Sequence, residues 1–453
     1  MKLVSSLRQT WKEDPLLRRV IRNTALLFSG NTIAMLLTGL QGLVTAALLG
    51  PSDYGLLGLI TLFASNINRL LSFRMGEVVI KYAGQNLALG EKKQAAAVVK
   101  AAGLAEAVTS LVAYLVLALL TPLAARWIVK DPQTAPWILY YGLALLANLM
   151  TETSTAVLQI GNHYRTQTAL NLVLSMLTLV LILVASLLHG GIYAVLTAYL
   201  LGKLVFGLGT MGMAAYHARA MLGEDWWKAS LDLIPNRGEM VRFAISTNLG
   251  GTVNLLIRDS EVLWVGLFFS PLEAGYYKFA LAVQNLLVTP VNPLITTTFP
   301  EISRFVAQRD WAQLRGLLRR TSFLAGLWTV SSAIGLIVLG PWGLRWFKGG
   351  AYLPSFPAIL ILFLGYGLAN IFFWNRPLLL AFGQPNYPLL VNTLVGLAKT
   401  ALMFVLVKPL GFLAQATLLS GYFLLSVWLI TRRGLQELKG AAGRPPDQGP
   451  SQG

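Results

Sequence analysis

Asn254-Leu-Leu-Ile-Arg258-Asp259-Ser-Glu261 is a charged stretch within an otherwise apolar run from Phe243 to Phe269. The run is long enough to cross a bilayer as a helix. Each charge at the centre of a membrane helix costs about 2.5 to 3.5 kcal/mol, so the three charges together cost about 8 to 10 kcal/mol without compensation. The stretch therefore predicts a membrane helix whose charged side chains face the protein interior.

On a continuous helix, most polar residues of this stretch share one narrow face. They recur at i, i+4, i+7, i+11 and i+14, as Thr247, Gly251, Asn254, Arg258 and Glu261. Asp259 is expected about 100° away, toward a neighbouring helix. One interpretation is a helix that lines a water-filled, ion-bearing cavity. The alternative is a buried ion pair between Arg258 and Glu261, at i, i+3, that only fixes helix packing.

The composition of the whole chain is that of a polytopic membrane protein. Hydrophobic residues make up 55% of the 453 residues and charged residues 12%, and the mean hydropathy is +0.62. Cysteine is absent, which excludes disulfides, thiolate metal sites and a catalytic thiol. The histidines, His163, His189 and His217, are scattered singly, so we expect no metal site, no histidine nucleophile and no cofactor.

Apolar runs predict an all-α protein with about 12 transmembrane helices. The predicted spans are 24–49, 54–73, 101–120, 137–160, 168–188, 192–215, 243–269, 276–298, 321–339, 356–382, 389–407 and 412–430. The predicted organisation is a cytoplasmic interfacial helix at 1–23, an N-terminal six-helix lobe at 24–215, a cytoplasmic linker at 216–242, a C-terminal six-helix lobe at 243–433 and a disordered cytoplasmic tail at 434–453.

Lys and Arg residues are distributed unevenly between the two sides of this topology. The side with both termini has 25 of the 36, and the other side has 5. By the positive-inside rule, both termini are expected in the cytoplasm. The net charge of +17 is therefore mostly a topology signal, and nucleic acid is not an expected partner.

Three short patterns recur at an offset of about 220 residues. The repeated pairs are Pro122-Leu-Ala-Ala-Arg-Trp127 with Pro341-Trp-Gly-Leu-Arg-Trp346, Leu146-Ala-Asn148 with Leu368-Ala-Asn370, and Pro51, Asp53 and Gly55 with Pro271, Glu273 and Gly275. Because each half has an even number of spans, the halves are expected to be parallel repeats. Two such lobes with a cleft between them predict an alternating-access transporter.

Polar residues inside the predicted spans are the candidate site. The expected substrate-binding cations of a central lumen are Arg69, Arg258, Lys278, Arg376 and Lys399, the expected polar lining is Asn31, Asn66, Asn254, Asn285 and Asn292, and the candidates for ion or proton coupling are Glu152, Asp259 and Glu261. Basic groups with amides between them suit phosphate oxygens and sugar hydroxyls. Each single lysine can instead snorkel or pair locally, and the glutamates can instead be helix-packing residues.

Three segments resemble the Wzx-type O-antigen and exopolysaccharide flippases of the multidrug/oligosaccharidyl-lipid/polysaccharide (MOP) superfamily. They are Leu49-Gly-Pro-Ser-Asp-Tyr-Gly-Leu56, Asp259 followed by Gly275-Tyr-Tyr277, and Phe299-Pro-Glu-Ile-Ser-Arg304. The resemblance covers about residues 23–433 and implies a MATE-like fold of two lobes in a bacterial or archaeal cytoplasmic membrane. It also implies a cationic lumen, with Arg69, Arg258 and Lys278 in that role, whereas Glu261 beside Asp259 departs from the family pattern.

The function that this resemblance implies is a flippase for polysaccharide biosynthesis, not an enzyme. Its substrate would be an oligosaccharide repeat unit linked through pyrophosphate to a polyprenol, moved from the inner to the outer leaflet. Membrane lipids and other polysaccharide-assembly membrane proteins are the further expected partners. The alternatives are a cation-coupled multidrug antiporter on the same fold, which the excess of embedded bases disfavours, a lipid II-type flippase, and a membrane sugar polymerase or glycosyltransferase.

Overall fold

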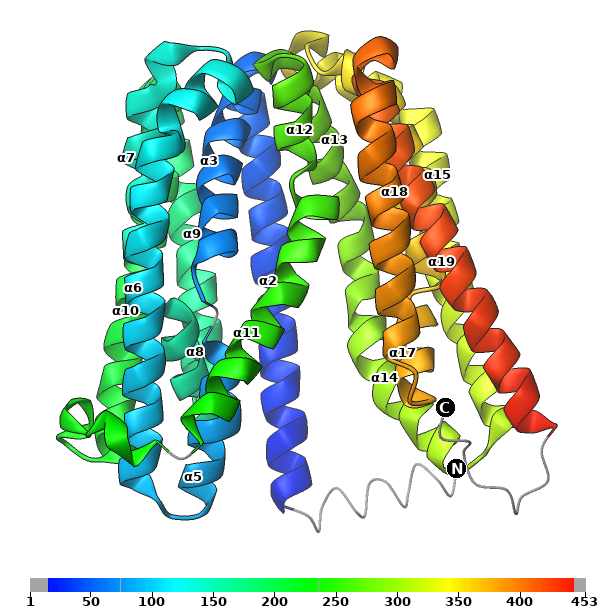
Figure 1. Cartoon of the computed structure of the whole chain (residues 1–453). Helices are drawn as coiled ribbons and strands as arrows, with labels where there is room; N and C mark the ends of the chain where they lie inside the picture. The colour runs from blue at the N-terminus through cyan, green and yellow to red at the C-terminus, as the bar shows by residue number, and fades with distance from the viewer. Residues whose placement is uncertain (1–14, 74, 235, 444–453) are drawn as a thin grey trace. The chain divides into compact units, whose positions relative to one another are not determined.

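The computed structural model describes residues 15–73, 75–234 and 236–443, which fold into helices joined by short turns (Figure 1). Nine helices in these ranges are long and apolar enough to cross a membrane. The number is ten if a bent pair, Pro51–Leu71 with Gly76–Ala88, counts as one span. The other two predicted spans, 243–269 and 276–298, correspond to helices that are interrupted near their middles.

The chain divides into two compact units. Unit 1 comprises Met1–Thr45 and Leu57–Leu256, and unit 2 comprises Ala46–Leu56 and Ile257–Gly453. These ranges differ from the predicted lobes, because the helix at 237–254 packs within unit 1 and the residues around the turn at Gly50 belong to unit 2.

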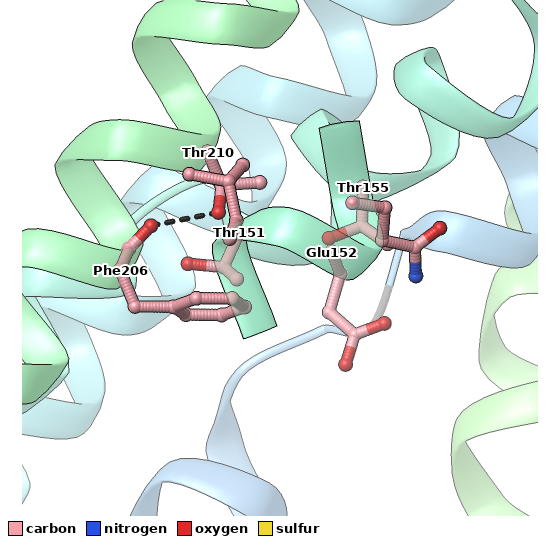
Figure 2. A pocket seen from close by; sticks show the side chains of 7 residues that line it. Thr151, Glu152, Thr155, Phe206 and Thr210 are labelled. Atoms are coloured by element: carbon pink, nitrogen blue, oxygen red, sulfur yellow. Dashed lines mark hydrogen bonds between the residues drawn. The ribbon is translucent and has the colours of Figure 1, made fainter. Parts of the chain in front are cut away.

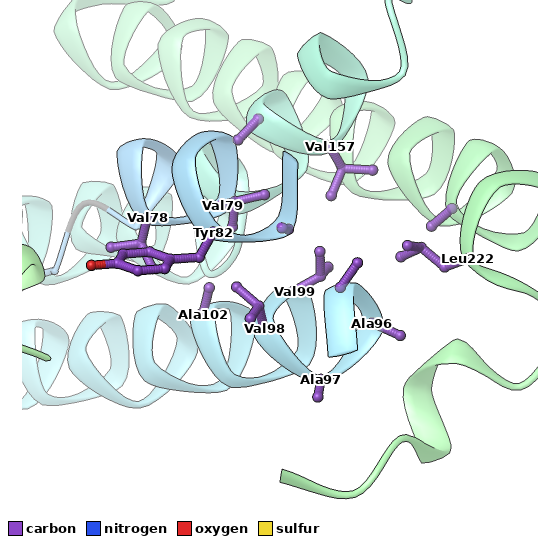
Figure 3. Packing of buried hydrophobic residues seen from close by; sticks show 14 of the residues in the cluster. Val78, Val79, Tyr82, Ala96, Ala97, Val98, Val99, Ala102, Val157 and Leu222 are labelled. Atoms are coloured by element: carbon purple, nitrogen blue, oxygen red, sulfur yellow. The ribbon is translucent and has the colours of Figure 1, made fainter. Parts of the chain in front are cut away.

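Unit 1 contains most of the N-terminal half. Its main helices are α2 (Pro15–Leu49), α3 (Pro51–Leu71), α4 (Gly76–Val78), α5 (Gly84–Ala88), α6 (Lys92–Ala124), α7 (Ala135–Ala147), α8 (Thr151–Ile160), α9 (Tyr164–Leu187), α10 (Gly191–Leu222) and α11 (Arg237–Asn254). Helix α10 packs against α7, α8 and α9, and α6 packs against α7. Figure 3 shows Val79 and Tyr82 beside the small side chains at the start of α6, such as Ala96 and Ala102. Small residues on α6 permit this close approach.

Unit 2 contains the C-terminal half. Its second segment starts at Ile257, inside the π-helical turn η6 (Leu255–Asp259). Its helices are α12 (Glu261–Phe268), α13 (Pro271–Val288), α14 (Asn292–Ala307), α15 (Trp311–Trp346), α16 (Phe356–Ile371), α17 (Asn375–Ala381), α18 (Asn386–Leu410) and α19 (Phe412–Ala442). Helix α16 packs against α13, α15 and α19, and α18 packs against α19. A 3-10 turn at Thr289–Val291, which contains Pro290, separates α13 from α14 because proline cannot donate a helical hydrogen bond.

The repeated turn motifs meet one another inside unit 2. Ser270 caps α13 by accepting a hydrogen bond from the Leu272 amide at 3.2 Å, and Pro271 fills the first helical position. A Cβ atom on Gly55 would collide with the carbonyl oxygen of Pro271, and one on Gly275 would collide with that of Pro51. The start of α3 and the start of α13 therefore cross in a reciprocal contact that only glycine permits at these two positions.

Two predicted boundaries need correction. Helix α2 runs unbroken from Pro15 through residue 23, so the described part of the predicted interfacial helix is continuous with the first span, while residues 1–14 lie outside the described residues. The prediction that disorder begins at Gly434 was wrong, because α19 continues to Ala442. Its last turns are held by the buried Leu438 and by an Arg433–Glu437 ion pair of 2.7 Å at i, i+4. Residues 444–453 lie outside the described residues.

Candidate functional site

The charged stretch of the sequence lies at a break in its helix. Leu255–Asp259 forms the π-helical turn η6, and α12 begins at Glu261. Such a turn contains an extra residue, so the residues after it are rotated relative to those before it. The prediction that Arg258 and Glu261 share one face was therefore wrong: the Arg258 side chain is 55% exposed, and the Glu261 side chain is 1% exposed.

Glu261 is the centre of a buried polar cluster, the Glu261 cluster, to which Lys399, Tyr277 and Gln415 also belong. Lys399 of α18 donates to the Oε1 atom of Glu261, while the Tyr277 hydroxyl and the Gln415 amide donate to Oε2 at 2.8 and 2.7 Å. Lys399 also donates to the carbonyl oxygen of Ile257, within η6, at 2.9 Å. A buried ion pair is tolerated when its charges are paired and its other lone pairs are hydrogen-bonded, and the cluster meets both conditions.

This pairing changes the expected role of Lys399. It was predicted as a lumen cation, but its side chain is 3% exposed and its charge is compensated by Glu261. The alternative of a buried Arg258–Glu261 pair is not seen either, because Lys399 is the partner of the carboxylate. In this conformation, the ammonium of Lys399 is not presented to a substrate.

Arg258 and Lys278 have different local partners. The Arg258 Nε atom lies 3.7 Å from an oxygen of Asp259, and its guanidinium lies 5.9 Å from the Phe423 ring centre. Lys278 donates to the carbonyl oxygen of Tyr54 at 3.3 Å and lies 4.0 Å from the centre of that ring. Of the two, Arg258 has the charged group that is mostly exposed, whereas Lys278 is partly buried against the first turn of α3.

The other predicted residues are dispersed over both units. Arg69 near the end of α3, Asn285 on α13 and Arg376 on α17 are exposed, Asn292 at the start of α14 is partly buried, and Asn66 in α3 is buried. The side chains of Asn31 and Asn254 lie outside the described residues. Among the predicted residues, the structure brings together Glu261 with Lys399 and Arg258 with Asp259.

Glu152 belongs to a polar cavity within unit 1 (Figure 2). The cavity has a volume of about 190 Å³, and its walls are Thr151, Glu152 and Thr155 of α8, Gln167 and Leu170 of α9, and Phe206 and Thr210 of α10. Thr210 donates its hydroxyl to the carbonyl oxygen of Phe206 at 2.7 Å. In Figure 2 the Phe206 ring lies on the left and the Glu152 carboxylate on the right. We call this the unit 1 cavity; the sequence had indicated only its glutamate, although Thr151 and Thr155 have the i, i+4 spacing of one helix face.

A second carboxylate holds the helix that carries Glu152. Glu106 of α6 is 2% exposed, and it accepts hydrogen bonds from the amides of Glu152 and Thr153 at 2.8 and 2.9 Å. These amides are in the first turn of α8, where backbone N–H groups have no partner within the helix. A negative charge is also favoured at this end of a helix. Glu106 is thus a positioning residue for the unit 1 cavity.

Two histidines that are far apart in the sequence stack on one another. The rings of His163 and His217 have centres 3.6 Å apart and planes inclined by 22°. Burial, together with the neighbouring His217, lowers the pKa of His163 below its usual 6.5. The described residues contain no group of three or more side chains that could hold a metal ion.

Comparison with known proteins places these features in a family. A family model described as polysaccharide biosynthesis protein matches residues 44–357. The inner membrane protein YghQ of Escherichia coli strain K12 is 23% identical over 354 residues, which are 77% of this chain and 98% of that protein.

Solved structures show the same fold at low sequence identity. The lipid II flippase MurJ in an inward closed conformation has a TM-score of 0.71 and 13% identity, with 92% of this chain and 90% of that chain covered. An inward-facing MATE family multidrug resistance transporter has a TM-score of 0.67 and 14% identity, with 90% and 95% covered. A MOP superfamily transporter from Pyrococcus furiosus has a TM-score of 0.61 and 13% identity, with 94% and 96% covered.

The predicted all-α polytopic fold of the MATE-like MOP type is thereby confirmed. The chain belongs to the polysaccharide biosynthesis protein family, is a multi-pass membrane protein, and has the fold of the MOP superfamily.

Proposed function

We propose that this transporter is a flippase for oligosaccharide repeat units linked through pyrophosphate to a polyprenol. It moves them from the inner to the outer leaflet of the cytoplasmic membrane by alternating access, with both termini in the cytoplasm. Family membership supports the pathway, and the uneven distribution of Lys and Arg supports the orientation.

The observation that carries the proposal is the exposed guanidinium of Arg258 at the break before α12. The adjacent Glu261–Lys399 pair is neutral within unit 2, so it leaves Arg258 as the mostly exposed cation of the charged stretch. A planar guanidinium can bind a phosphate group through two parallel hydrogen bonds. A polar group in a membrane segment is also expected to face water or protein rather than lipid. Arg258 is therefore our first candidate for contact with the pyrophosphate.

The unit 1 cavity supports a complementary role in sugar recognition. Hydroxyl, amide and carboxylate groups can donate to or accept from sugar hydroxyls, and the Phe206 ring gives an apolar surface for one face of a sugar ring. Movement of the anion outward is assisted by an inside-negative potential, by about 2.3 kcal/mol per charge per 100 mV.

One observation favours a second candidate function, a cation-coupled multidrug antiporter. The carboxylate of Glu152 in the unit 1 cavity suits a cation, and a MATE transporter shares the fold. A dye-efflux assay in whole cells separates the two functions, because an antiporter would lower dye accumulation and a flippase would not.

Complementation of a flippase-deficient strain tests the proposal. The wild-type chain is expected to restore surface polysaccharide, and the Arg258→Ala/Lys278→Ala double variant is expected to reach the membrane but fail to do so. Lys93→Ala, which removes an exposed cation at the start of α6, is the matched control and should complement fully. Full complementation by the double variant would contradict the proposal.

A further inference from the structure

A second cationic feature lies in a groove between α16 and α19 of unit 2. The groove has a volume of about 430 Å³. Leu368 of α16, Phe372 directly after it and Val427 of α19 form apolar walls, and Arg432 and Lys439 of α19 supply positive charge. An apolar groove with cations along one stretch has the chemistry of a site for an amphipathic anion.

The groove lies along one exposed face of α19. Trp428, Arg432, Leu435 and Lys439 follow one another at i, i+4, i+7 and i+11 and so share one face. Trp428 is 53% exposed and Leu435 is 39% exposed. Exposed apolar side chains on a membrane helix indicate contact with hydrocarbon, whereas a pathway for a sugar pyrophosphate would be polar. The groove therefore suits a lipid of the bilayer better than the transported oligosaccharide.

The basic side chains of the groove are arranged to receive an anion. The Arg432 guanidinium lies over the Trp428 ring, 5.4 Å from its centre, and the Arg432 side chain is exposed. Within residues 15–443, apart from the two gaps, no carboxylate lies at ion-pair distance from Arg432 or Lys439. The neighbouring Arg433 differs, because Glu437 neutralises it at 2.7 Å and it lies over the Tyr387 ring.

We propose that this groove is a binding site for an anionic membrane phospholipid. Its phosphate lies between Arg432 and Lys439, which are separated by about 10 Å along the helix, and an acyl chain follows the apolar wall formed by Phe372 and Val427. Basic residues near an anionic membrane surface each contribute about one order of magnitude or less to lipid affinity. The site is independent of substrate binding at Arg258.

Lipid titration of the purified full chain tests this assignment. Delipidated protein in detergent is titrated with phosphatidylglycerol or phosphatidylcholine, and bound lipid is counted by native mass spectrometry. The wild-type chain is expected to prefer phosphatidylglycerol about tenfold. The Arg432→Gln/Lys439→Gln variant should lose that preference while keeping weak binding of both lipids, and Arg433→Gln, the matched control from the same helix turn, should keep it.

Three outcomes would overturn the proposal. The first is an unchanged phosphatidylglycerol preference in Arg432→Gln/Lys439→Gln, and the second is equal binding of the two lipids by the wild-type chain. The third is displacement of phosphatidylglycerol by an equimolar amount of farnesyl diphosphate, which would assign the groove to a polyprenyl diphosphate instead. A charge-reversed variant, Arg432→Glu, gives an independent reading, since it should bind phosphatidylglycerol more weakly than phosphatidylcholine.

Discussion

Among the residues that the structure describes, each unit buries one carboxylate beside a break in a helix, but the two units compensate that charge differently. In unit 1, Glu106 accepts two backbone N–H groups from the start of α8. In unit 2, Glu261 is paired with Lys399 and hydrogen-bonded by Tyr277 and Gln415, which lie on three other helices. The first arrangement is a helix cap that fixes α8. The second ties α12 to α13, α18 and α19 through an ion pair and two hydrogen bonds.

This difference suggests which of the two buried carboxylates is coupled to the residues around Arg258. Glu106 holds only the start of α8 in place, so removal of its carboxylate is expected to affect mainly the unit 1 cavity. The Glu261 cluster also includes the Ile257 carbonyl oxygen, one residue before Arg258. Separation of α12 from α18 would therefore change the backbone next to Arg258.

The largest expected effect is that of Lys399→Met, which tests the ionic compensation in unit 2. Removal of one partner leaves Glu261 charged and buried, which destabilises a protein by about 3 to 5 kcal/mol. We expect a markedly lower midpoint in thermal unfolding of the purified protein. Glu261→Gln combined with Lys399→Met should recover most of the loss. If the single variant melts like the wild type, the ion pair does not hold unit 2 together.

A smaller effect is expected in unit 1 for Glu106→Gln. The amide retains one acceptor but turns an N–H group toward the amides of α8, so a hydrogen bond to a charged group is lost at about 1.5 to 3 kcal/mol. Thermal unfolding measures the loss, and faster hydrogen exchange at Glu152 and Thr153 should locate it at the start of α8. Unchanged exchange there would mean that Glu106 does not cap this helix.

Gly275→Ala tests the close packing of α3 against α13 without changing any charge in unit 2. The added Cβ atom would meet the Pro51 carbonyl oxygen, which forces α3 and α13 apart and destabilises by about 1 to 3 kcal/mol. Gly421→Ala on α19 is the control, because nothing lies within 4 Å of the added atom. That control should be neutral or stabilising by up to about 1 kcal/mol. Equal melting temperatures for the two variants would contradict the reciprocal glycine contact.

The smallest expected effect concerns the stacked histidines of unit 1. Because burial and His217 lower the pKa of His163 in the folded protein, the unfolded chain binds the proton first as the pH falls. Stability should therefore decrease as the pH drops below about 6.5. His163→Gln should show a smaller decrease in melting temperature between pH 7.5 and 5.5. An equal decrease would show that another group controls this pH range.

The sequence predicted the helical fold because apolar runs are local signals, whereas the site depends on contacts between distant residues. The extra residue of the turn at 255–259 separates Arg258 from Glu261, and nothing in the run itself distinguishes that turn from a regular helix. The partner of Glu261, Lys399, lies 138 residues away. The cap by Glu106 and the stack of His163 on His217 likewise join different helices.

Other features of the site were visible in sequence patterns. The repeated Pro and Gly of the two turns marked the positions that later proved to be in contact, Pro51 with Gly275 and Gly55 with Pro271. The sequence also predicted that charges between Arg258 and Glu261 need compensation inside the protein, and the buried Glu261 is indeed paired with Lys399. What the pattern could not supply was the identity of the compensating group.

The central claim, that Arg258 binds the pyrophosphate of a lipid-linked oligosaccharide, is tested most directly in reconstituted vesicles. Wild-type, Arg258→Lys and Arg258→Ala chains, with Lys93→Ala as control, are compared for the rate at which a fluorescent polyprenyl-pyrophosphate oligosaccharide becomes accessible to an external quencher. We predict wild-type rates for Lys93→Ala, a partial rate for Arg258→Lys, which keeps the charge but not the paired hydrogen bonds, and a loss of at least about tenfold for Arg258→Ala. A wild-type rate for Arg258→Ala, in protein with an unchanged melting temperature, would contradict the claim.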